Sequence, residues 1–370
     1  MLLAIESSCD ETAVAVFDIK SYLSGDLCLS QALSGHLIQS QVSVHEEYGG
    51  VVPELAAREH LKNLGYLAPE ILTSSGFNFN NISHVAVTIG PGLKGCLLVG
   101  LAFAKGISTA LNIPLIPINH LEGHLLSVLL SCEVTEDIIF PSIFLLVSGG
   151  HTQIVYCTNT NGEICYRLLA TTQDDAAGEA FDKIGTLIGL PYPSGANISK
   201  LAEKGNNSVY SLPTCATDDP AKFSFSGLKT AASRLIKVNG EQIIGDPQGI
   251  ADFSFAVESA IVRALSEKVE WWISYYRSNN IKLGSIIVSG GVAANLNLRK
   301  SLADISDKNC LPLLIPEMKF CTDNAAMIGA AALFRMKNLN SVFASNPYSF
   351  INCSAEARFP LELLNEYYKE

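Results

Sequence analysis

The stretch LLAIESSCDETAVAVF, residues 2–17, decides the fold. Two apolar runs, Leu2–Glu6 and Ala13–Phe17, flank a short polar turn, and this pattern predicts two buried strands joined as a hairpin. The stretch IFLLVSGGHTQIVY at residues 143–156 has the same order of strand, polar turn and strand. A unit that recurs in the second half of a chain indicates duplication. The sequence therefore predicts two related α/β halves, each built on one such hairpin.

The turn Ser148-Gly149-Gly150 of the second hairpin has little side chain to obstruct an approaching anion. Backbone N–H groups of such a turn can converge on a phosphate. A plain β-hairpin explains either turn alone, but the repetition favours phosphate binding. A Gly-Gly turn between a strand and Asn295 also suits a nucleotide. Asp182 lies beside an apolar helical stripe predicted over 176–189; it faces a cleft or, equally well, is a solvated side chain.

The composition predicts a compact protein with two domains. The chain has 370 residues, of which 48% are hydrophobic and 16% are charged, and a single core stops growing at about 250–300 residues. The formal net charge of −11 argues against a broad basic surface for nucleic acid. If a nucleic acid is the substrate, a local basic patch or a partner has to supply the attraction.

The cysteines and the N-terminus predict a cytoplasmic protein with reduced thiols. None of the ten cysteines belongs to a C-x-x-C pair, and the chain opens without a basic, apolar signal peptide. The longest apolar stretch, residues 96–118, is interrupted by Lys105 and by glycines and prolines. It therefore predicts a buried helix followed by a strand, and we expect no membrane span.

His120 and His124 lie in the stretch PINHLEGH at residues 117–124. A spacing of four on a helix brings two imidazoles to one face, one turn apart, where they suit a single metal ion. Glu122 differs from the glutamate of the zinc-protease pattern H-E-x-x-H because it falls on the face opposite His120. It is therefore badly placed to act as a base. Two ordinary histidines near a helix start are the alternative interpretation.

Asp323 is the candidate third ligand. It stands in the segment Cys321-Thr-Asp-Asn324, just before a helix of very small residues. Taken alone, Thr322 or Asp323 is explained as the cap of that helix. Two histidines and one carboxylate, however, form the ligand set that suits iron(II) and also zinc, with positions left open for substrate.

Eight motifs together resemble the bacterial branch of the tRNA N6-adenosine threonylcarbamoyltransferases, the TsaD family. They occur in order, and the resemblance runs from residue 2 to about residue 337. The motifs are Ile5–Thr12, Glu47–Ala56, Gly90–Leu93, His120–His124, Leu146–Gln153, Asp174–Lys183, Phe223–Thr230 and Cys321–Asn324. Two departures remove no motif residue: residues 21–30 lengthen the first hairpin region, and Ser194 precedes Gly195 where many members carry glycine.

The resemblance implies the actin-like ATPase (ASKHA) fold, with two duplicated ribonuclease-H-like domains around a central cleft. We expect the first domain at residues 1–137 and the second at 138–324, with the C-terminal helix and tail, about 325–370, packing back on the first. The implied activity is transfer of a threonylcarbamoyl group from threonylcarbamoyl-adenylate to N6 of adenosine 37, in tRNAs that read codons beginning with A.

The resemblance also implies site residues and partners. One iron, Fe(2+), with Zn(2+) as the alternative, would be held by His120, His124 and Asp323. The adenylate substrate, or ATP or ADP, would be held by Leu146, Val147, Ser148, Gly149, Gly150, Asp182, Gly195 and Asn295. Asp10 and Glu11 in the first turn are candidates for the catalytic base by position only. The implied partners are the tRNA, a companion actin-like subunit of the TsaB type, a companion ATPase of the TsaE type and a separate TsaC-type synthase that makes the adenylate.

Three other functions compete with this interpretation. A metalloprotease is disfavoured by the position of Glu122 and by the expected cytoplasmic location. An actin-like small-molecule kinase or ATPase would need the phosphate-binding hairpins but not a His-His-Asp site. A non-catalytic partner subunit would keep the fold and would have no reason to keep all three metal-type residues.

Overall fold

The computed structural model describes residues 1–370 except 132–137, 161, 207–208, 215–218, 339–349 and 368–370. The chain forms two compact units. Unit 1 comprises Met1–Asp137, Thr158–Tyr166 and Pro316–Glu370, and unit 2 comprises Ile138–Cys157 and Arg167–Ile315. Residues 158–166 and 316–324, which the sequence assigned to the second domain, thus belong to unit 1. The domain limits proposed from the sequence stay a prediction, because a compact unit is not by itself an evolutionary domain.

Unit 1 is built on a mixed sheet of five strands in the order β3-β2-β1-β4-β5. β1 pairs antiparallel with β2, which pairs antiparallel with β3, while β1, β4 and β5 run parallel. β1 and β4 are almost entirely buried, as expected for central strands covered on both faces. The strands are β1 (Leu2–Glu6), β2 (Glu11–Phe17), β3 (Leu33–Ser40), β4 (His84–Gly90) and β5 (Leu115–Asn119).

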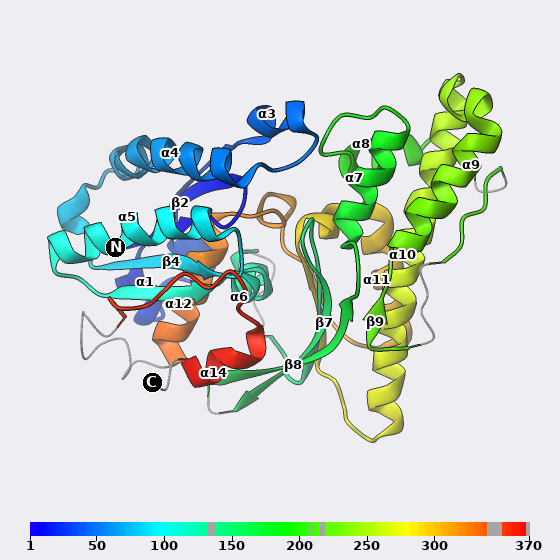
Figure 1. Ribbon diagram of the computed structural model, residues 1–370. Coiled ribbons are helices and arrows are strands. Elements are labelled where there is room, and N and C mark those ends of the chain that lie inside the picture. Colours follow the sequence, from blue (N-terminus) through cyan, green and yellow to red (C-terminus); the bar gives the residue numbers. More distant parts are fainter. Residues whose placement is uncertain (132–137, 161, 207–208, 215–218, 339–349, 368–370) are drawn as a thin grey trace. The chain divides into compact units, whose positions relative to one another are not determined.

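Helices cover both faces of this sheet (Figure 1). α5 lies on the face of Ile5, because a Cβ on its Gly100 would approach the Ile5 side chain at 3.8 Å. α12 lies on the other face, where Gly329 is in close contact with Phe17. Ile5 pairs with Val14, and Phe17 is three residues further along β2, so the two side chains point to opposite faces. The sheet therefore has a covered core on each side.

The helices of unit 1 range from one turn to six. The α-helices are α1 (Ile19–Leu23), α2 (Leu29–Ala32), α3 (Val42–His45), α4 (Pro53–Ser74), α5 (Lys94–Leu111), α6 (His120–Leu126), α12 (Ala325–Asn338) and α14 (Leu364–Tyr367). Single 3-10 turns are Glu46–Tyr48, Phe79–Asn81, Ser127–Leu130, Met318–Phe320 and Leu361–Leu363. Within the described residues, α5 is the one helix with the length and composition of a membrane span, but it packs on β4 and α4 as a cover of the sheet.

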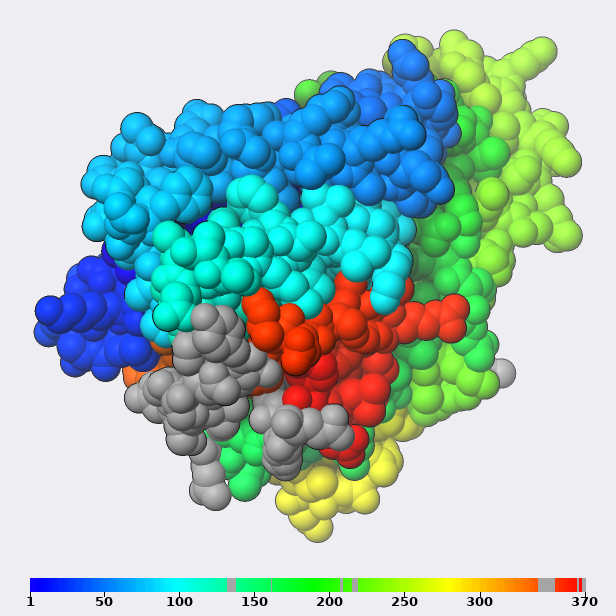
Figure 2. Space-filling model, turned by 60° about the vertical axis from the view of Figure 1, so that its left-hand side comes forward, coloured from blue at the N-terminus to red at the C-terminus, as the bar shows by residue number. Residues whose placement is uncertain are grey.

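The C-terminal segment lies along α5 and the ends of β4 and β5, as Figure 2 shows in red beside the cyan helix. Glu356 donates its N–H to the carbonyl of Ile89 at 2.7 Å, and Lys105 donates to the carbonyl of Cys353 at 2.6 Å. Asn119, which ends β5, donates to the carbonyl of Phe359 at 2.8 Å. The segment thus ties together the carboxyl ends of the parallel strands.

Unit 2 repeats the topology of unit 1. Its six-stranded sheet has the order β11-β10-β6-β7-β8-β9, so that β8-β7-β6-β10-β11 matches β3-β2-β1-β4-β5. β6 pairs antiparallel with β7 and parallel with β10, as β1 pairs with β2 and β4. The duplication predicted from the two hairpins is therefore confirmed. The strands are β6 (Ser142–Val147), β7 (Thr152–Thr160), β8 (Glu163–Thr172), β9 (Lys222–Phe223), β10 (Ser285–Ser289) and β11 (Leu313–Leu314).

The helices of unit 2 are mostly long. They are α7 (Ala177–Leu187), α8 (Gly195–Ala202), α9 (Ser226–Ile244), α10 (Pro247–Ser278) and α11 (Leu296–Asn309), with a 3-10 turn at Gly291–Ala294. α10 contacts α8, α9 and α11 and buries one continuous side, including Phe253, Val257 and Ile261. α10 is thus the core helix of unit 2.

Candidate functional site

The histidine helix α6 starts where the buried strand β5 ends. Asn119 is its cap: the side-chain oxygen accepts from the N–H of Leu121 at 2.8 Å. The first turn of α6 is therefore fixed, and His120 and His124 lie one turn apart with their rings 4.8 Å from each other, edge to face. Both are buried, with 5% and 0% of their surfaces exposed.

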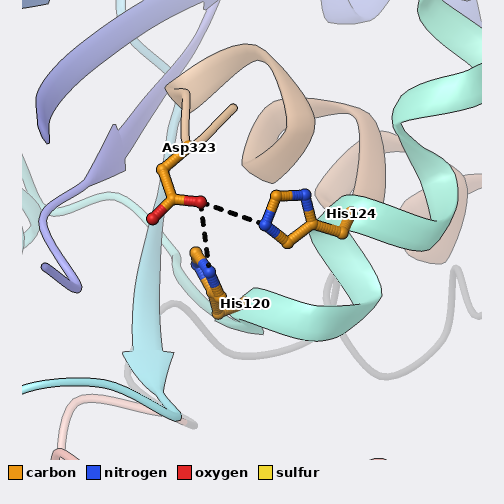
Figure 3. Close-up of side chains that lie close together, drawn as sticks. All are labelled: His120, His124 and Asp323. Atoms are coloured by element: carbon orange, nitrogen blue, oxygen red, sulfur yellow. Dashed lines mark hydrogen bonds and ion pairs between the residues drawn. The ribbon is translucent and has the colours of Figure 1, made fainter. Parts of the chain in front are cut away.

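Asp323 completes the group, as Figure 3 shows. Its Oδ1 lies 3.0 Å from Nε2 of His124 and 3.5 Å from Nε2 of His120. One donor atom from each of the three residues lies within 4.8 Å of the others. The structure therefore brings together, within unit 1, the three residues that the sequence put forward as metal ligands.

The N-cap of α12 is Asn324. The alternative interpretation of Asp323, in which Thr322 or Asp323 caps this helix, is therefore wrong. The side-chain oxygen of Asn324 accepts from the N–H of Met327 at 2.9 Å, and α12 begins at Ala325. Since Asn324 satisfies the helix end, the carboxylate of Asp323 is available to the histidines.

Glu6, which was missed in the sequence, orients His120. Its Oε2 lies 3.2 Å from Nδ1 of His120, and Oγ of Ser8 lies at the same distance. The carboxylate is itself held by the N–H of Ser8 at 2.6 Å and the hydroxyl of Thr88 at 2.5 Å. A carboxylate behind the distal nitrogen of a histidine is the usual support of a metal ligand. The sequence feature that could have identified Glu6 is a charged residue at the end of a buried strand.

The protonation of the two histidines differs. Burial lowers the pKa of His120, but the carboxylates of Asp323 and Glu6 outweigh it and raise the pKa to about 9. Burial lowers the pKa of His124, although the hydrogen bond to Asp323 opposes it. A cation is thus favoured beside Asp323.

The donor set fits a divalent transition metal. Two imidazole nitrogens and one carboxylate oxygen face one point, as iron(II) and zinc sites require. Nδ1 of His124 is buried and has no hydrogen-bond partner in the described part of the chain, so Nε2 is the nitrogen that the protein directs at Asp323. These residues are consistent with a metal cofactor, and three protein ligands leave coordination positions for substrate.

Asp10 ends the β1–β2 turn and Glu11 begins β2, and Glu11 is close enough to Asp323 of this group to interact with it electrostatically. The carbonyl of Asp10 accepts from the N–H of Gln41 at 2.9 Å. Burial, together with the charges of Asp10 and Asp323, raises the pKa of Glu11 well above its usual range. A carboxyl group with a raised pKa is a better proton acceptor once ionised.

A buried chain of hydrogen bonds holds the same turn from behind. His60 donates from Nε2 to the carbonyl of Cys9 at 2.9 Å, so its Nδ1 accepts from the hydroxyl of Thr12 at 2.8 Å. Gln41 donates to Thr12 at 3.3 Å and accepts from Nε2 of His45 at 3.3 Å. The contacts of both ring nitrogens thus fix His60 in one neutral tautomer.

The second turn, Ser148–His151 in unit 2, is open. Ser148 donates its N–H to the carbonyl of His151 at 2.8 Å, which closes the turn. Gly149 and Gly150 are exposed, a Cβ on either would meet no atom within 4 Å, and their N–H groups have no partner among the described residues. Leu146 and Val147 are fully buried in β6 and supply the rigid base. An open turn of small residues is the kind of turn at which an anion can approach backbone N–H groups.

The other residues expected around the adenylate make hydrogen bonds at and near α8 in unit 2. Asp182 accepts from the N–H of Ser194 at 2.7 Å, directly before Gly195 at the start of α8. Asn295 donates to Ser199 of the same helix at 2.7 Å and to Glu258 at 2.5 Å. Glu258, 2% exposed, was not singled out in the sequence. Asp182 thus holds the start of α8 and Asn295 holds its middle, while a Cβ on Gly195 would approach Phe181 at 3.7 Å.

Comparisons with known proteins agree with this description. A sequence model of the TsaD family, described as tRNA N6-adenosine threonylcarbamoyltransferase, matches residues 32–330. Proteins of that name from Herminiimonas arsenicoxydans and Nitrosomonas eutropha are 42% and 41% identical to this chain, over 99% and 98% of it and 99% of each relative. The protein of that name from Bordetella avium is 42% identical over 91% of this chain and 92% of its own.

Among solved structures, HypF of T. kodakarensis is similar to this chain with a TM-score of 0.53 and 13% identity. The match covers 92% of this chain and 48% of the HypF chain. At that identity the likeness shows the fold alone, which is the actin-like ATPase fold expected from the sequence. Similarity over almost the entire length decides the family. This chain belongs to the TsaD family of tRNA N6-adenosine threonylcarbamoyltransferases, and it is an acyltransferase of tRNA modification.

Proposed function

We propose that the protein transfers the threonylcarbamoyl group of threonylcarbamoyl-adenylate to N6 of adenosine 37, in tRNAs that read codons beginning with A, with one iron held by His120, His124 and Asp323. The observation that carries the metal site is the convergence of three ligand atoms within 4.8 Å, two from buried histidines and one from the half-buried Asp323. The arrangement of Glu6 behind His120 supports it, because an ordinary pair of histidines needs no such partner. Zinc is the alternative metal.

The reaction forms a bond between N6 and the carbamoyl carbon and breaks the bond between that carbon and the phosphate oxygen, so that AMP leaves with the electron pair. A metal with open positions would supply Lewis-acid stabilisation of the carbonyl oxygen. Asp10 or Glu11, by their position after β1, would accept the proton that the amine loses. In unit 2, the N–H groups of Gly149 and Gly150 hold the phosphate of the adenylate.

A metalloprotease is a poor alternative for a specific reason. Glu122 accepts two hydrogen bonds from Arg335 at 2.6 Å and one from Tyr166 at 2.5 Å. A carboxylate held by three donors on the far side of α6 cannot polarise a water at the histidines.

Partners are part of the proposal. The net charge of −11 makes unaided tRNA binding unfavourable, so we propose cytoplasmic partners of the TsaB and TsaE types and a TsaC-type synthase. α4 and α5 expose large apolar side chains, Leu61 at 69%, Tyr66 at 45% and Leu98 at 49%, which suit a protein partner. Binding of the TsaB-type subunit should therefore fall strongly in Leu98→Glu, measured by calorimetry.

The test is formation of threonylcarbamoyladenosine, read by mass spectrometry of digested tRNA, after addition of the adenylate, iron(II) and the companion proteins. Asp323→Ala should lose both bound iron and product, whereas Asp307→Ala, an exposed aspartate of α11, should keep both. Product in Asp323→Ala would overturn the metal site and keep the transferase. No product from the native protein with active companions would overturn the transferase.

A further inference from the structure

Glu122, which lies between the two histidines in the sequence, is held in a buried ion pair of unit 1. It is 1% exposed, and Arg335 of α12 is 5% exposed. Nε of Arg335 donates to Oε2 and an Nη donates to Oε1, both at 2.6 Å, so the two planar groups meet at two points. Tyr166 donates to Oε1 at 2.5 Å. This pair connects α6, which carries two of the metal-type residues, with α12, which directly follows the third.

Stability alone does not explain such a pair. Removing two charges from water costs so much that well-packed apolar side chains of similar volume are often at least as stabilising. What an arginine and a carboxylate add is geometry, because their two parallel hydrogen bonds form in one relative orientation only. The position of the pair is therefore the informative feature.

α6 and α12 are also close to each other at a second point. A Cβ on Gly123 would lie 2.9 Å from Ile328 and 3.2 Å from Met327, so the absence of a side chain lets the two helices approach. Ile328 and Arg335 are seven residues apart, two turns of α12. Two separate contacts along one helix fix both its distance and its axial position relative to α6.

The distances between the three candidate metal ligands depend on the position of α12 relative to α6. Asp323 meets His124 and His120 across the same helix pair, at 3.0 and 3.5 Å. Metal–ligand distances tolerate about 0.2 Å, and productive sites about 0.5 Å. A slide of α12 along α6 by a fraction of a turn would move the carboxylate out of reach.

We propose that Glu122 and Arg335 are positioning residues: their two-point ion pair locks α12 against α6 and so sets the distance from Asp323 to the two histidines. The role rests on the proposed metal site. It also accounts for a glutamate on the face of α6 opposite the ligands, where the protease-type base could not act.

The test uses cobalt(II) as a spectroscopic probe on the full chain, because its visible absorption reports both affinity and ligand geometry. Arg335→Lys keeps the charge but offers one donor group in place of the fork. We expect it to bind cobalt(II) at least 10-fold more weakly and with a changed spectrum. Tyr166→Phe, which leaves the fork intact, should have a smaller effect.

Two further variants separate positioning from folding. Glu122→Leu with Arg335→Met replaces the pair by apolar side chains, and it should fold yet bind cobalt(II) at least 10-fold more weakly. Leu333→Ala, a fully buried residue of α12 outside the pair, should unfold more easily and bind cobalt(II) as the native protein does.

Native affinity and spectrum in both Arg335→Lys and the double variant would overturn the positioning role and leave the metal site standing. If Asp323→Ala bound cobalt(II) as the native protein does, the metal site itself would be overturned, and the positioning role with it.

Discussion

The two hairpin turns of the duplicated fold occupy equivalent places and have opposite characters. The β1–β2 turn of unit 1 is enclosed: Ser7 and Ser8 are buried, Ser7 donates to the carbonyl of Cys96 at 3.1 Å, and the carbonyl of Ser8 accepts from Leu93 at 2.8 Å. The β6–β7 turn of unit 2 exposes Gly149 and Gly150, and their backbone is open.

The difference shows how one topology serves two chemical tasks. In unit 1 the polar groups of the turn are directed at the protein's own residues, and Ser8 with the neighbouring Glu6 supports His120. In unit 2, Gly149 and Gly150 have no side chains, and their N–H groups remain for a ligand. We propose that the first turn organises the metal-type residues and that the second binds an anion.

The largest expected effect concerns the enclosed turn. Glu6→Gln keeps the shape of the side chain but removes the charge behind Nδ1 of His120, so affinity for iron(II) or cobalt(II) should fall by about 10- to 100-fold. Competition with a chelator measures it. Glu11→Gln is the matched control, which should keep metal affinity and lower the transfer rate. Equal metal affinity in Glu6→Gln and the native protein would contradict the supporting role.

Next is the packing beneath the open turn. A Cβ on Gly178 of α7 would lie 2.7 Å from the carbonyl oxygen of Ser148 and 2.9 Å from Cα of Gly149. Gly178→Ala should therefore displace the turn, lower the unfolding free energy by about 1–3 kcal/mol and weaken adenylate binding. Denaturant unfolding and calorimetry measure the two effects. Gly106→Ala, in open space on α5, should cause neither, and a native-like Gly178→Ala would show that the turn is not tightly supported.

Much of this arrangement could be predicted from the sequence. The repeated hairpins predicted the duplication, because two apolar runs around a short polar turn are a local signal. His120 and His124 could be paired since both lie on one helix. Asp323 could be proposed as a ligand only together with the two histidines. Both Asp323 and Asn324 are residue types that cap helices, and which of them does so is known only once the helix start is known.

The remaining residues depended on contacts that no local pattern records. Glu6 and His120 are 114 positions apart and meet only because β1, β4 and β5 run parallel and end together. Glu122 and Arg335 are 213 positions apart. The sequence excluded Glu122 as a base by its face of the helix, but it could not supply the partner on that face.

A smaller effect should appear in acid. Burial lowers the pKa of His60 in the folded protein, although the carbonyl of Cys9 opposes this, whereas the unfolded chain has a pKa of about 6.5. The unfolded state therefore takes up the proton first as the pH falls. The stability that neutral His60 contributes is complete above about pH 6.5 and is lost progressively below it.

His60→Gln should remove this contribution, and its unfolding free energy should fall by about 1 kcal/mol less between pH 7 and 5.5 than that of the native protein. Denaturant unfolding at the two pH values, followed by a probe in unit 1, measures it. Equal pH dependence of the two proteins would mean that the chain of hydrogen bonds behind the enclosed turn does not keep His60 neutral.

The smallest change separates the two turns most sharply. Gly149→Ala adds a methyl group that would meet no protein atom within 4 Å, so the unfolding free energy should stay within about 0.5 kcal/mol of the native value. The same methyl group would stand where an anion approaches the N–H groups, and we expect a few-fold loss of adenylate affinity by calorimetry. Gly227→Ala, equally open but on α9, should change neither. If Gly149→Ala bound the adenylate as tightly as the native protein, the second turn would be an ordinary hairpin, since a surface kept open for a ligand has to respond when that space is filled.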